Sequence, residues 1–230
     1  MKVVADIIPD MDKHPNRKRE TFPEIHSEEF WRIYTIAAPY TLLHIPGLYN
    51  LFQSVNYICR NKIEGDLVEC GCFLGGAAIM MWHTLALNKA RRTIRLFDTF
   101  TGFDDGEEDI GTTVKGMVLP DFRLQVLSNL SDAGASTDDF VLVQGKVENT
   151  LPGLKLPALS LLRLDTDFYS STKVEFETLY PKLVSGGVLI VDDYGVFQGA
   201  RKATDDYLQT LDHAPLLNRV CVGAWAGVKP

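Results

Sequence analysis

Acidic side chains follow two hydrophobic runs of the sequence, at the points where the runs end. Asp165 and Asp167 come directly after the run that begins at Leu159, and Asp192 and Asp193 come directly after a second run. A span with helical character separates the runs, so they have the order strand, helix, strand. Because the carboxyl ends of neighbouring parallel strands meet at one edge of a sheet, we expect these carboxylates to lie close together. Clustered carboxylates predict a site for a hard divalent cation such as Mg²⁺, and the absence of nearby Cys or His disfavours zinc.

The four acids need not share one role. We assign Asp165, Asp192 and Asp193 to the cation, and we expect Asp167 to be a general base that takes a proton from a hydroxyl group. Methyl transfer to oxygen requires this deprotonation and a methyl donor that is held in line with the oxygen. The alternative for each acid is a cap, either for the helix after Asp193 or before Ser170.

A glycine-rich turn between the first strand and its helix predicts a nucleotide-like site. The stretch 69–76 (ECGCFLGG) lets the backbone approach a ligand, and Asp98 ends the second strand, where an acid can accept hydrogen bonds from a ribose. The spacing differs from the G-x-G-x-x-G of nicotinamide dinucleotide sites, so the pattern favours S-adenosylmethionine. Close packing of the turn and a cap role for Asp98 are the structural alternatives. The residues that we expect to bind the donor are Glu69, Gly71, Gly75, Asp98, Thr99, Gly145 and Asp165.

The elements that position these residues follow a regular alternation from Asp66 onward. Continuous Leu/Val/Ile runs alternate with amphipathic helices, which predicts parallel strands buried on both faces in a doubly wound α/β fold. The tail 218–229 has the length of a strand pair and could close the sheet antiparallel. Apolar residues at helical spacing from Glu29 to Asn61 predict two helices, and residues 1–30 are typical of a mobile arm, a frayed terminus or a segment that a ligand or a neighbouring subunit orders.

Composition narrows the possible partners. The 230 residues carry a formal net charge of −7, which argues against nucleic acid, because phosphate binding uses clustered Lys and Arg. No apolar run is long enough to span a bilayer, and the first residues lack the apolar core of a signal peptide, so we expect a cytoplasmic protein without membrane contact. The four cysteines are interpreted as buried thiols.

Several long stretches together resemble the macrocin O-methyltransferase (TylF-like) family of S-adenosylmethionine- and Mg²⁺-dependent sugar O-methyltransferases in antibiotic biosynthesis. The resemblance covers roughly residues 38–210. It rests on PYTLLHIPGLYNLFQSVNYI, GDLVECGCFLGGAAIMM, LFDTFTGF, LRLDTDFYSSTKVEFETLYPKLVSGGVLIVDDYG and GARKATDDY. The sequence differs from many relatives at Thr166, where they carry Gly, and at Ser170, where they carry Glu.

The resemblance implies a class I methyltransferase (Rossmann-like) fold with a mostly parallel seven-stranded sheet and an N-terminal helical extension. Residues 1–61 would then be an arm and helices for a lid or for oligomerisation, and residues 62–230 the methyltransferase domain. It implies a cation held by Asp165, Asp192 and Asp193, a general base at Asp167, a small-molecule acceptor and a homo-oligomer. The stretch Thr101–Pro120 would be a lid over the donor, with its acids 104, 105 and 107–109 in solvent.

The acceptor remains open among several classes. A sugar hydroxyl of a glycosylated natural product is the leading hypothesis, and a catechol-type phenol is its rival. A nicotinamide-dependent sugar oxidoreductase and a non-catalytic donor-binding protein are the alternatives from other classes. Tyr40, Tyr49 and Phe52 either line an acceptor pocket or pack in the core, which is the commoner fate of such residues.

Overall fold

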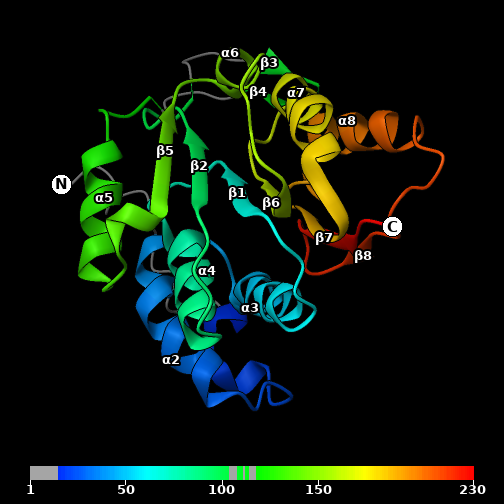
Figure 1. Ribbon diagram of the computed structural model, residues 1–230. Coiled ribbons are helices and arrows are strands. Elements are labelled where there is room, and N and C mark those ends of the chain that lie inside the picture. The colour runs from blue at the N-terminus through cyan, green and yellow to red at the C-terminus, as the bar shows by residue number, and fades with distance from the viewer. Residues whose placement is uncertain (1–14, 104–107, 111, 114–117) are drawn as a thin grey trace.

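The computed structural model describes residues 15–103, 108–110, 112–113 and 118–230, and its centre is a single seven-stranded sheet (Figure 1). The strands of this sheet are β1 (Asp66–Cys70), β2 (Ile94–Asp98), β5 (Phe140–Gln144), β6 (Leu159–Leu164), β7 (Leu183–Val191), β8 (Asn218–Arg219) and β9 (Trp225–Val228). Their order is β5-β2-β1-β6-β7-β9-β8. The first five are parallel, and β9 runs antiparallel to both of its neighbours. A separate pair, β3 (Glu108–Asp109) and β4 (Thr112–Thr113), lies outside it. The predicted fold class is confirmed, and so is the antiparallel closure by the tail.

The central strands carry hydrophobic side chains on both faces of the sheet. In β1, Leu67 belongs to one buried cluster and Val68 to a second cluster on the opposite face. In β6, Leu161 and Leu162 divide between the clusters in the same way. Because successive strand residues point to opposite faces, a strand that is covered on both sides needs apolar residues at almost every position. This requirement explains the continuous Leu/Val/Ile runs of the sequence.

Helices cover the two faces as separate layers (Figure 1). On one face lie α2 (Glu28–Ala37), α3 (Ile45–Arg60), α4 (Gly76–Leu87) and α5 (Arg123–Asp132), whose buried residues share a cluster with β1, β2 and β6. The other face is covered by α6 (Val147–Thr150), α7 (Tyr169–Leu179) and α8 (Gln198–Leu208). Parallel strands between two helical layers place all the βα connections of the sheet at the carboxyl ends of its strands, where ligands of such folds bind.

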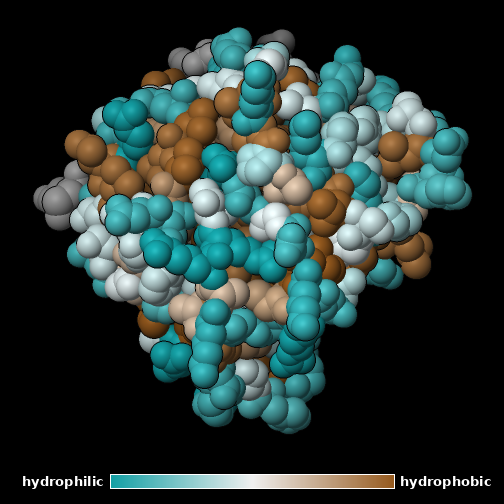
Figure 2. Space-filling model, viewed as in Figure 1, coloured by the Kyte–Doolittle hydropathy of each residue, from teal (hydrophilic) through white to brown (hydrophobic). Residues whose placement is uncertain are grey.

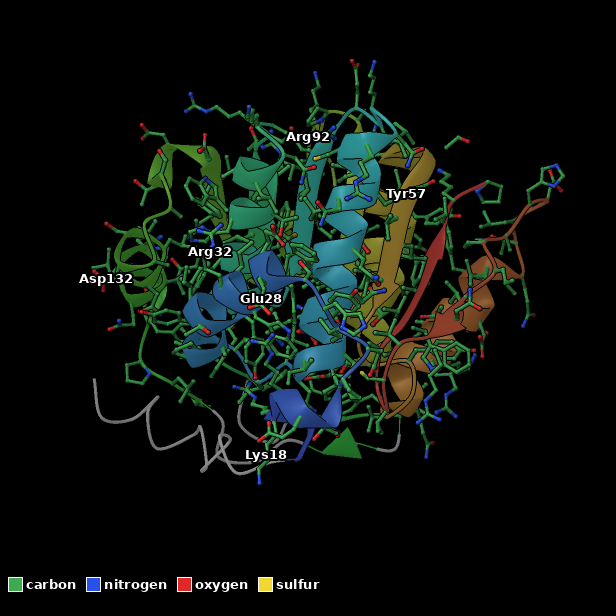
Figure 3. The ribbon with its side chains drawn as sticks, turned by 90° about the horizontal axis from the view of Figure 1, so that it is seen from below. Lys18, Glu28, Arg32, Tyr57, Arg92 and Asp132 are labelled. Atoms are coloured by element: carbon green, nitrogen blue, oxygen red, sulfur yellow. The ribbon has the colours of Figure 1, made fainter. Side chains whose placement is uncertain are left out.

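The N-terminal helices belong to the same packed layer as α4. Figure 3 shows α2 and α3 beside α4, with Glu28 and Arg32 on the outer side of α2. The described part of the predicted arm contains two short 3₁₀ helices, Pro15–Arg17 and Arg19–Thr21. The buried guanidinium group of Arg17 donates to the carbonyl oxygens of Ala38 (3.1 Å), Thr41 and Leu43 (2.9 Å). Residues 15–21 are therefore fixed to the connection between α2 and α3, whereas residues 1–14 lie outside the described residues.

The molecular surface is mixed in character. On the face in view in Figure 2, hydrophobic side chains are interspersed with hydrophilic ones. Among the helices of the described residues, none is long and apolar enough to cross a lipid bilayer.

Candidate active site

The candidate active site is a cavity of about 630 Å³ at the carboxyl ends of the parallel strands. Nine of the ten predicted site residues line it, from the ends of β1, β2, β5, β6 and β7. They are Glu69, Gly71, Asp98, Thr99, Gly145, Asp165, Asp167, Asp192 and Asp193. The tenth residue, Gly75, is the N-cap of α4 with a φ of 88°. A volume of this size lies within the usual range for small-molecule sites.

Gly71 brings the ends of β1 and β6 together. Its φ is 79°, and a Cβ atom on it would lie 1.8 Å from the carbonyl oxygen of Asp165. The Asp165 N–H in turn donates to the carbonyl oxygen of Cys70 at 3.0 Å. Any other residue would push the Asp165 backbone away, so this glycine is required by strand packing as well as by access for a ligand.

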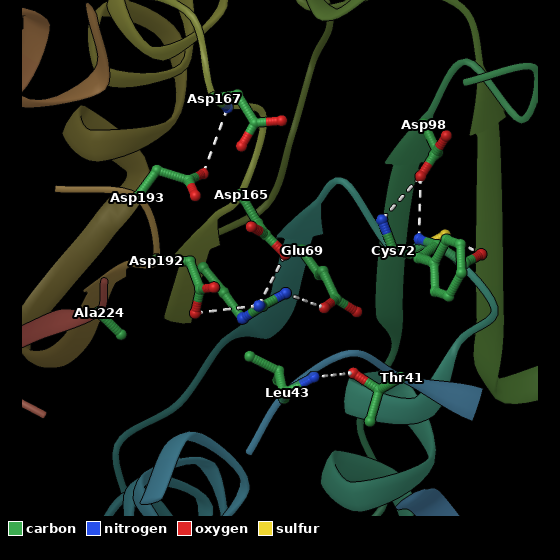
Figure 4. Close-up of polar contacts among 12 residues, drawn as sticks. Thr41, Leu43, Glu69, Cys72, Asp98, Asp165, Asp167, Asp192, Asp193 and Ala224 are labelled. Atoms are coloured by element: carbon green, nitrogen blue, oxygen red, sulfur yellow. Dashed lines mark hydrogen bonds and ion pairs between the residues drawn. The ribbon is translucent and has the colours of Figure 1, made fainter. Parts of the chain in front are cut away.

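Three carboxylates of the predicted acidic cluster face one another (Figure 4). Asp165, Asp167 and Asp193 each offer an oxygen within 4.8 Å of the other two. Burial raises the pKa of Asp165 and Asp193 well above the usual range, and the neighbouring carboxylates add to both shifts. The pKa of Asp167 is also raised by burial. Hard oxygen donors with uncompensated negative charge fit a divalent cation, which would relieve the repulsion.

A buried arginine under the cluster compensates part of its charge. Arg163 of β6 is 2% exposed, and its Nη1 lies 2.5 Å from Oε1 of the fully buried Glu69. Its Nη2 lies 2.7 Å from Asp165 Oδ2 and 3.0 Å from Asp192 Oδ1. Burial raises the pKa of Glu69 to about 7, against the lowering influence of Arg163. One arginine therefore faces three carboxylates, while Asp167 and Asp193 have no basic partner among the described ion pairs.

Asp167 occupies an unusual backbone conformation. Its φ is 69°, and the N–H of Phe168 donates to the carbonyl oxygen of Thr166 at 2.8 Å, two residues back. This is a γ-turn with a positive φ at its centre, a strained and rare arrangement. The N–H of Asp167 donates to Asp193 Oδ2 at 3.2 Å. The turn therefore directs the Asp167 N–H at Asp193, while the Asp167 side chain lines the cavity (Figure 4).

The opposite side of the cavity is built around Asp98. Its Oδ2 accepts from the N–H groups of Cys72 (2.8 Å) and Phe73 (3.1 Å) in the glycine-rich turn, and its Oδ1 accepts from Phe100 N–H (2.7 Å). The backbone around it is also tied down, since Gly145 N–H donates to the Asp98 carbonyl oxygen. The bond from Phe100 is the cap that the alternative predicted, and the bonds from Cys72 and Phe73 join the ends of β1 and β2. Asp98 also lines the cavity.

The comparison with known proteins agrees with this arrangement. The family model described as "Macrocin-O-methyltransferase (TylF)" matches residues 28–225. The chain belongs to this family. The match extends from α2 to the start of β9 and so contains every residue of the candidate site.

Curated relatives place this family member among O-methyltransferases. It is 32% identical over 186 residues to demethyldecarbamoylnovobiocin O-methyltransferase of Streptomyces niveus, covering 77% of this chain and 71% of the relative. It is 32% identical over 176 residues to 8-demethyl-8-(2,3-dimethoxy-alpha-L-rhamnosyl)-tetracenomycin-C 4'-O-methyltransferase of Streptomyces olivaceus, covering 73% and 67%. The prediction of an S-adenosylmethionine-dependent O-methyltransferase is confirmed at the level of the family.

Solved structures give the same fold. The O-methyltransferase NovP is 29% identical and matches with a TM-score of 0.74 over 83% of this chain and 82% of its own. The calicheamicin methyltransferase CalS11 matches with a TM-score of 0.66 at 19% identity, over 92% and 93%, and its likeness concerns the fold alone. The macrocin-type chain therefore has the class I methyltransferase fold.

The three aromatic residues that we considered for an acceptor pocket are not among the residues that line the cavity. Phe52 is buried in the first hydrophobic cluster, and Tyr40 and Tyr49 pack against it. Tyr49 also lines a separate groove of about 760 Å³ between α3 and the β8–β9 edge. The structure favours core packing for these three. The N-terminal wall of the cavity consists instead of Thr41, Leu42 and Leu43, the connection that Arg17 holds.

The predicted lid, Thr101–Pro120, is only partly within the described residues. At its base, Gly102 forms a bridge with Val118, and Leu119 N–H donates to the Thr101 carbonyl oxygen at 2.7 Å. Phe103 and Leu119 line the cavity. Residues 104–107, 111 and 114–117 lie outside the described part, as do the side chains of all five acids that we expected in solvent.

Sequence reasoning missed two buried polar residues beside the site. Arg163 interrupts the apolar run LSLLRL, and Glu175 lies on the buried side of α7. A charged residue inside a strand that is covered on both faces needs a partner of opposite charge, so the Arg163 position could have indicated the ion pairs. Glu175 had no comparable signal, because Glu is a common residue on helix surfaces.

Proposed function

We propose that the protein transfers a methyl group from S-adenosylmethionine to a sugar hydroxyl of a glycosylated natural product, with a divalent cation at Asp165, Asp192 and Asp193. The observation that carries this proposal is the close approach of Asp165, Asp167 and Asp193 in the cavity of a macrocin-type O-methyltransferase. Asp192 lies beside this group, since it shares the Arg163 guanidinium with Asp165. The names of three relatives support the acceptor class, since they refer to novobiocin, a rhamnosyl-tetracenomycin and mycinamicin.

The donor would occupy the side of the cavity formed by β1, β2 and β5. Glu69 Oε2 is buried without a hydrogen-bond partner among the described residues, and it lies in the cavity wall, where it can accept from the donor's amino group. Asp98 Oδ1 accepts a single N–H bond, so it keeps a lone pair for a ribose hydroxyl. Thr99 and Gly145 line the same side. The donor would supply a methyl group on a cationic sulfonium, which suits an acidic cavity.

The cation would lie on the side formed by β6 and β7. Asp165 and Asp192 each contact Arg163 through one oxygen and keep the other, while Asp193 is free of basic partners among the described ion pairs. These three residues can offer hard ligands from two adjacent strand ends. When bound, Mg²⁺ would supply Lewis acidity that makes an acceptor hydroxyl easier to deprotonate.

Asp167 would be the general base. Its side chain lines the cavity beside the cation site, and its raised pKa brings it closer to the pH range in which a base is useful. The acceptor hydroxyl would pass its proton to Asp167, and its oxygen would form the new bond to the methyl carbon. The bond from that carbon to sulfur would break, and the sulfur would leave as a neutral thioether.

The N-terminal region would complete the site. Because Arg17 holds the cavity wall at Thr41 and Leu43, we propose that the connection between α2 and α3 covers the acceptor side. We also propose that the N-terminal region takes part in a homo-oligomer. Size determination in solution, by light scattering, tests the oligomer: a monomer at assay concentration contradicts it.

Product analysis tests the proposed function. The purified protein is incubated with methyl-labelled S-adenosylmethionine and either an α-L-rhamnoside glycoside panel or catechol, with Mg²⁺ or with EDTA. We expect label on the sugar oxygen of at least one glycoside, lost in EDTA and in the Asp193→Ala variant. Label on catechol alone would replace the sugar by a phenolic acceptor. No transfer to either class would contradict the proposed function.

A further inference from the structure

Glu175 is a buried acid that the proposed chemistry does not use. It lies on α7, behind the Asp165–Asp167 segment, and its exposed fraction is 0%. Its Oε1 lies 3.0 Å from Thr166 Oγ1. Burial raises the pKa of Glu175 well above its usual range, and hydrogen bonds from the Thr166 hydroxyl and the Cys70 thiol oppose that shift. The contact with Thr166 joins Glu175 to the Asp165–Asp167 segment.

Hydrogen-bond geometry connects Glu175 to the turn that carries Asp167. Thr166 Oγ1 lies 2.9 Å from Ser171 Oγ, which lies 3.2 Å from the Thr166 carbonyl oxygen and 3.1 Å from that of Phe168. A hydroxyl group has one hydrogen to donate and can also accept. Thr166 Oγ1 is placed to donate to Glu175 Oε1, and its lone pairs remain available to Ser171 Oγ. Glu175 and Ser171 therefore both hold the Thr166 side chain.

The turn needs such support. A non-glycine residue with a φ of 69° is strained and persists only where its surroundings fix it. On the cavity side, the Asp167 N–H is held by Asp193. On the opposite side, the side-chain hydrogen bonds to the flanking residues Thr166 and Phe168 come from Glu175 and Ser171.

We infer that Glu175 is a positioning residue, which holds the γ-turn at Asp167 through the Thr166 hydroxyl and so places the base. The inference rests on the proposed function of Asp167. It assigns to Glu175 no contact with donor, cation or acceptor, since its side chain is fully buried and does not line the cavity.

Two substitutions at Glu175 separate positioning from packing. Glu175→Gln keeps a side-chain oxygen that can accept from the Thr166 hydroxyl, whereas Glu175→Leu removes every polar atom of the side chain. We expect kcat to fall about tenfold or more in Glu175→Leu, with the dissociation constant of the donor unchanged within about twofold, and to stay within about threefold of wild type in Glu175→Gln. The control is Glu177, which lies on the same helix, is half exposed and pairs with Lys173. Its replacement by Leu or Gln should leave kcat unchanged.

Amide hydrogen exchange gives a readout that does not depend on methylation. The Phe168 N–H closes the γ-turn, so its protection should fall about tenfold or more in Glu175→Leu and in Thr166→Val, and remain in Glu175→Gln. In the double variant Glu175→Leu/Thr166→Val the Phe168 amide should lose no more protection than in either single variant, because both residues act through the same hydrogen bond. The amide of Leu162 in β6 reports any general loss of stability.

The outcomes decide the inference separately from the proposed function. Loss of Phe168 protection in Glu175→Leu, with Leu162 unaffected and with recovery in Glu175→Gln, supports the inference even if no glycoside is methylated. Equal protection of Phe168 in all variants overturns it, and so does an equal loss in Glu175→Gln and Glu175→Leu. If wild type methylates catechol alone, the acceptor class fails while the exchange result still stands.

Discussion

The two sides of the cavity use the same residue type, an aspartate at a strand end, under opposite conditions. Asp98 is surrounded by N–H groups, three of which donate to its carboxylate. Asp193 receives one such hydrogen bond, from Asp167, and otherwise faces the carboxylates of Asp165, Asp167 and Asp192. Burial raises the pKa of both residues, but the N–H groups around Asp98 oppose the shift, whereas the carboxylates around Asp193 add to it.

The difference shows how the environment gives an aspartate its role. Backbone N–H groups stabilise a carboxylate and fix its position, so Asp98 is suited to hold the glycine-rich turn and to meet a neutral ribose. Carboxylates that crowd one another need a cation, and Arg163 reaches only Asp165 and Asp192 of the four. Four predictions follow from this contrast, in order of decreasing effect.

Replacing the proposed base should have the largest effect. Asp167→Asn keeps the size of the side chain but cannot take a proton, so kcat should fall by about 10² to 10⁴-fold. Binding of S-adenosylmethionine and of Mg²⁺, measured by calorimetry, should remain within a few-fold of wild type. Full activity would remove Asp167 from the role of base, and loss of Mg²⁺ affinity would make it a ligand instead.

Removing the buried arginine should destabilise the protein strongly. Arg163→Met leaves Glu69 buried without its partner, and breaking a buried ion pair costs about 3–5 kcal/mol of unfolding free energy. Urea unfolding at neutral pH measures the change. Lys173→Met is the control, because Lys173 pairs with Glu177, both side chains are about half exposed, and the loss of this pair should cost no more than about 1 kcal/mol. Equal stability of the two variants would show that the β6 side does not depend on Arg163.

A substitution on the β2 side should weaken binding of the donor and leave binding of the cation unchanged. Asp98→Asn halves the number of acceptor oxygens and leaves N–H groups of the turn without partners. This change should lower the free energy of unfolding by about 1–3 kcal/mol. We expect weaker S-adenosylmethionine binding and unchanged Mg²⁺ affinity in calorimetric titrations. A reduced Mg²⁺ affinity with intact donor binding would reverse the assignment of the two sides.

The smallest effect should be a pH-dependent gain of stability in Asp193→Asn without metal. Burial and then the neighbouring carboxylates raise the pKa of Asp193 in the folded state, so the folded protein binds this proton more tightly than the unfolded chain. Stability from that proton is complete below the ordinary pKa of about 3.8 and is lost as the pH rises through the folded value.

The sign of that prediction can be measured directly. Because the Asn variant cannot ionise, its melting temperature should exceed that of wild type by a margin that grows from pH 5 to pH 8, at about 2–4 °C for each kcal/mol. Added Mg²⁺ should reduce the margin by stabilising wild type. A constant margin, or one that shrinks with pH, would mean that Asp193 is not under repulsion.

Much of the fold follows from the sequence for a physical reason. Strands that are buried on both faces need continuous apolar runs, so the runs LSLLRL and GVLIV can be recognised as strands in the sequence. Because the two strands are parallel neighbours, the acids that follow them lie at the same edge of the sheet. The same pattern cannot show which acids face one another. The γ-turn at Asp167 depends on Thr166, Ser171 and Glu175, whose contacts exist only after α7 has packed.

The placement of aromatic residues was harder to predict for a similar reason. Tyr49 and Phe52 have the types that suit an acceptor pocket, but their place on α3 directs them into the packed layer and the separate groove. The N-terminal wall of the cavity is the short connection at 41–43. Arg17, more than 20 residues away in the sequence, holds this connection by hydrogen bonds to its carbonyl groups. Local patterns carry no signal for such a contact.

The central claim is that the β6–β7 side of the cavity binds a divalent cation. Crystals soaked in Mn²⁺, with anomalous diffraction data, test it most directly. We predict an anomalous peak at coordination distance from carboxylate oxygens of Asp165, Asp192 and Asp193, absent in Asp193→Ala. No peak in the cavity, or a peak beside Asp98, would contradict the account.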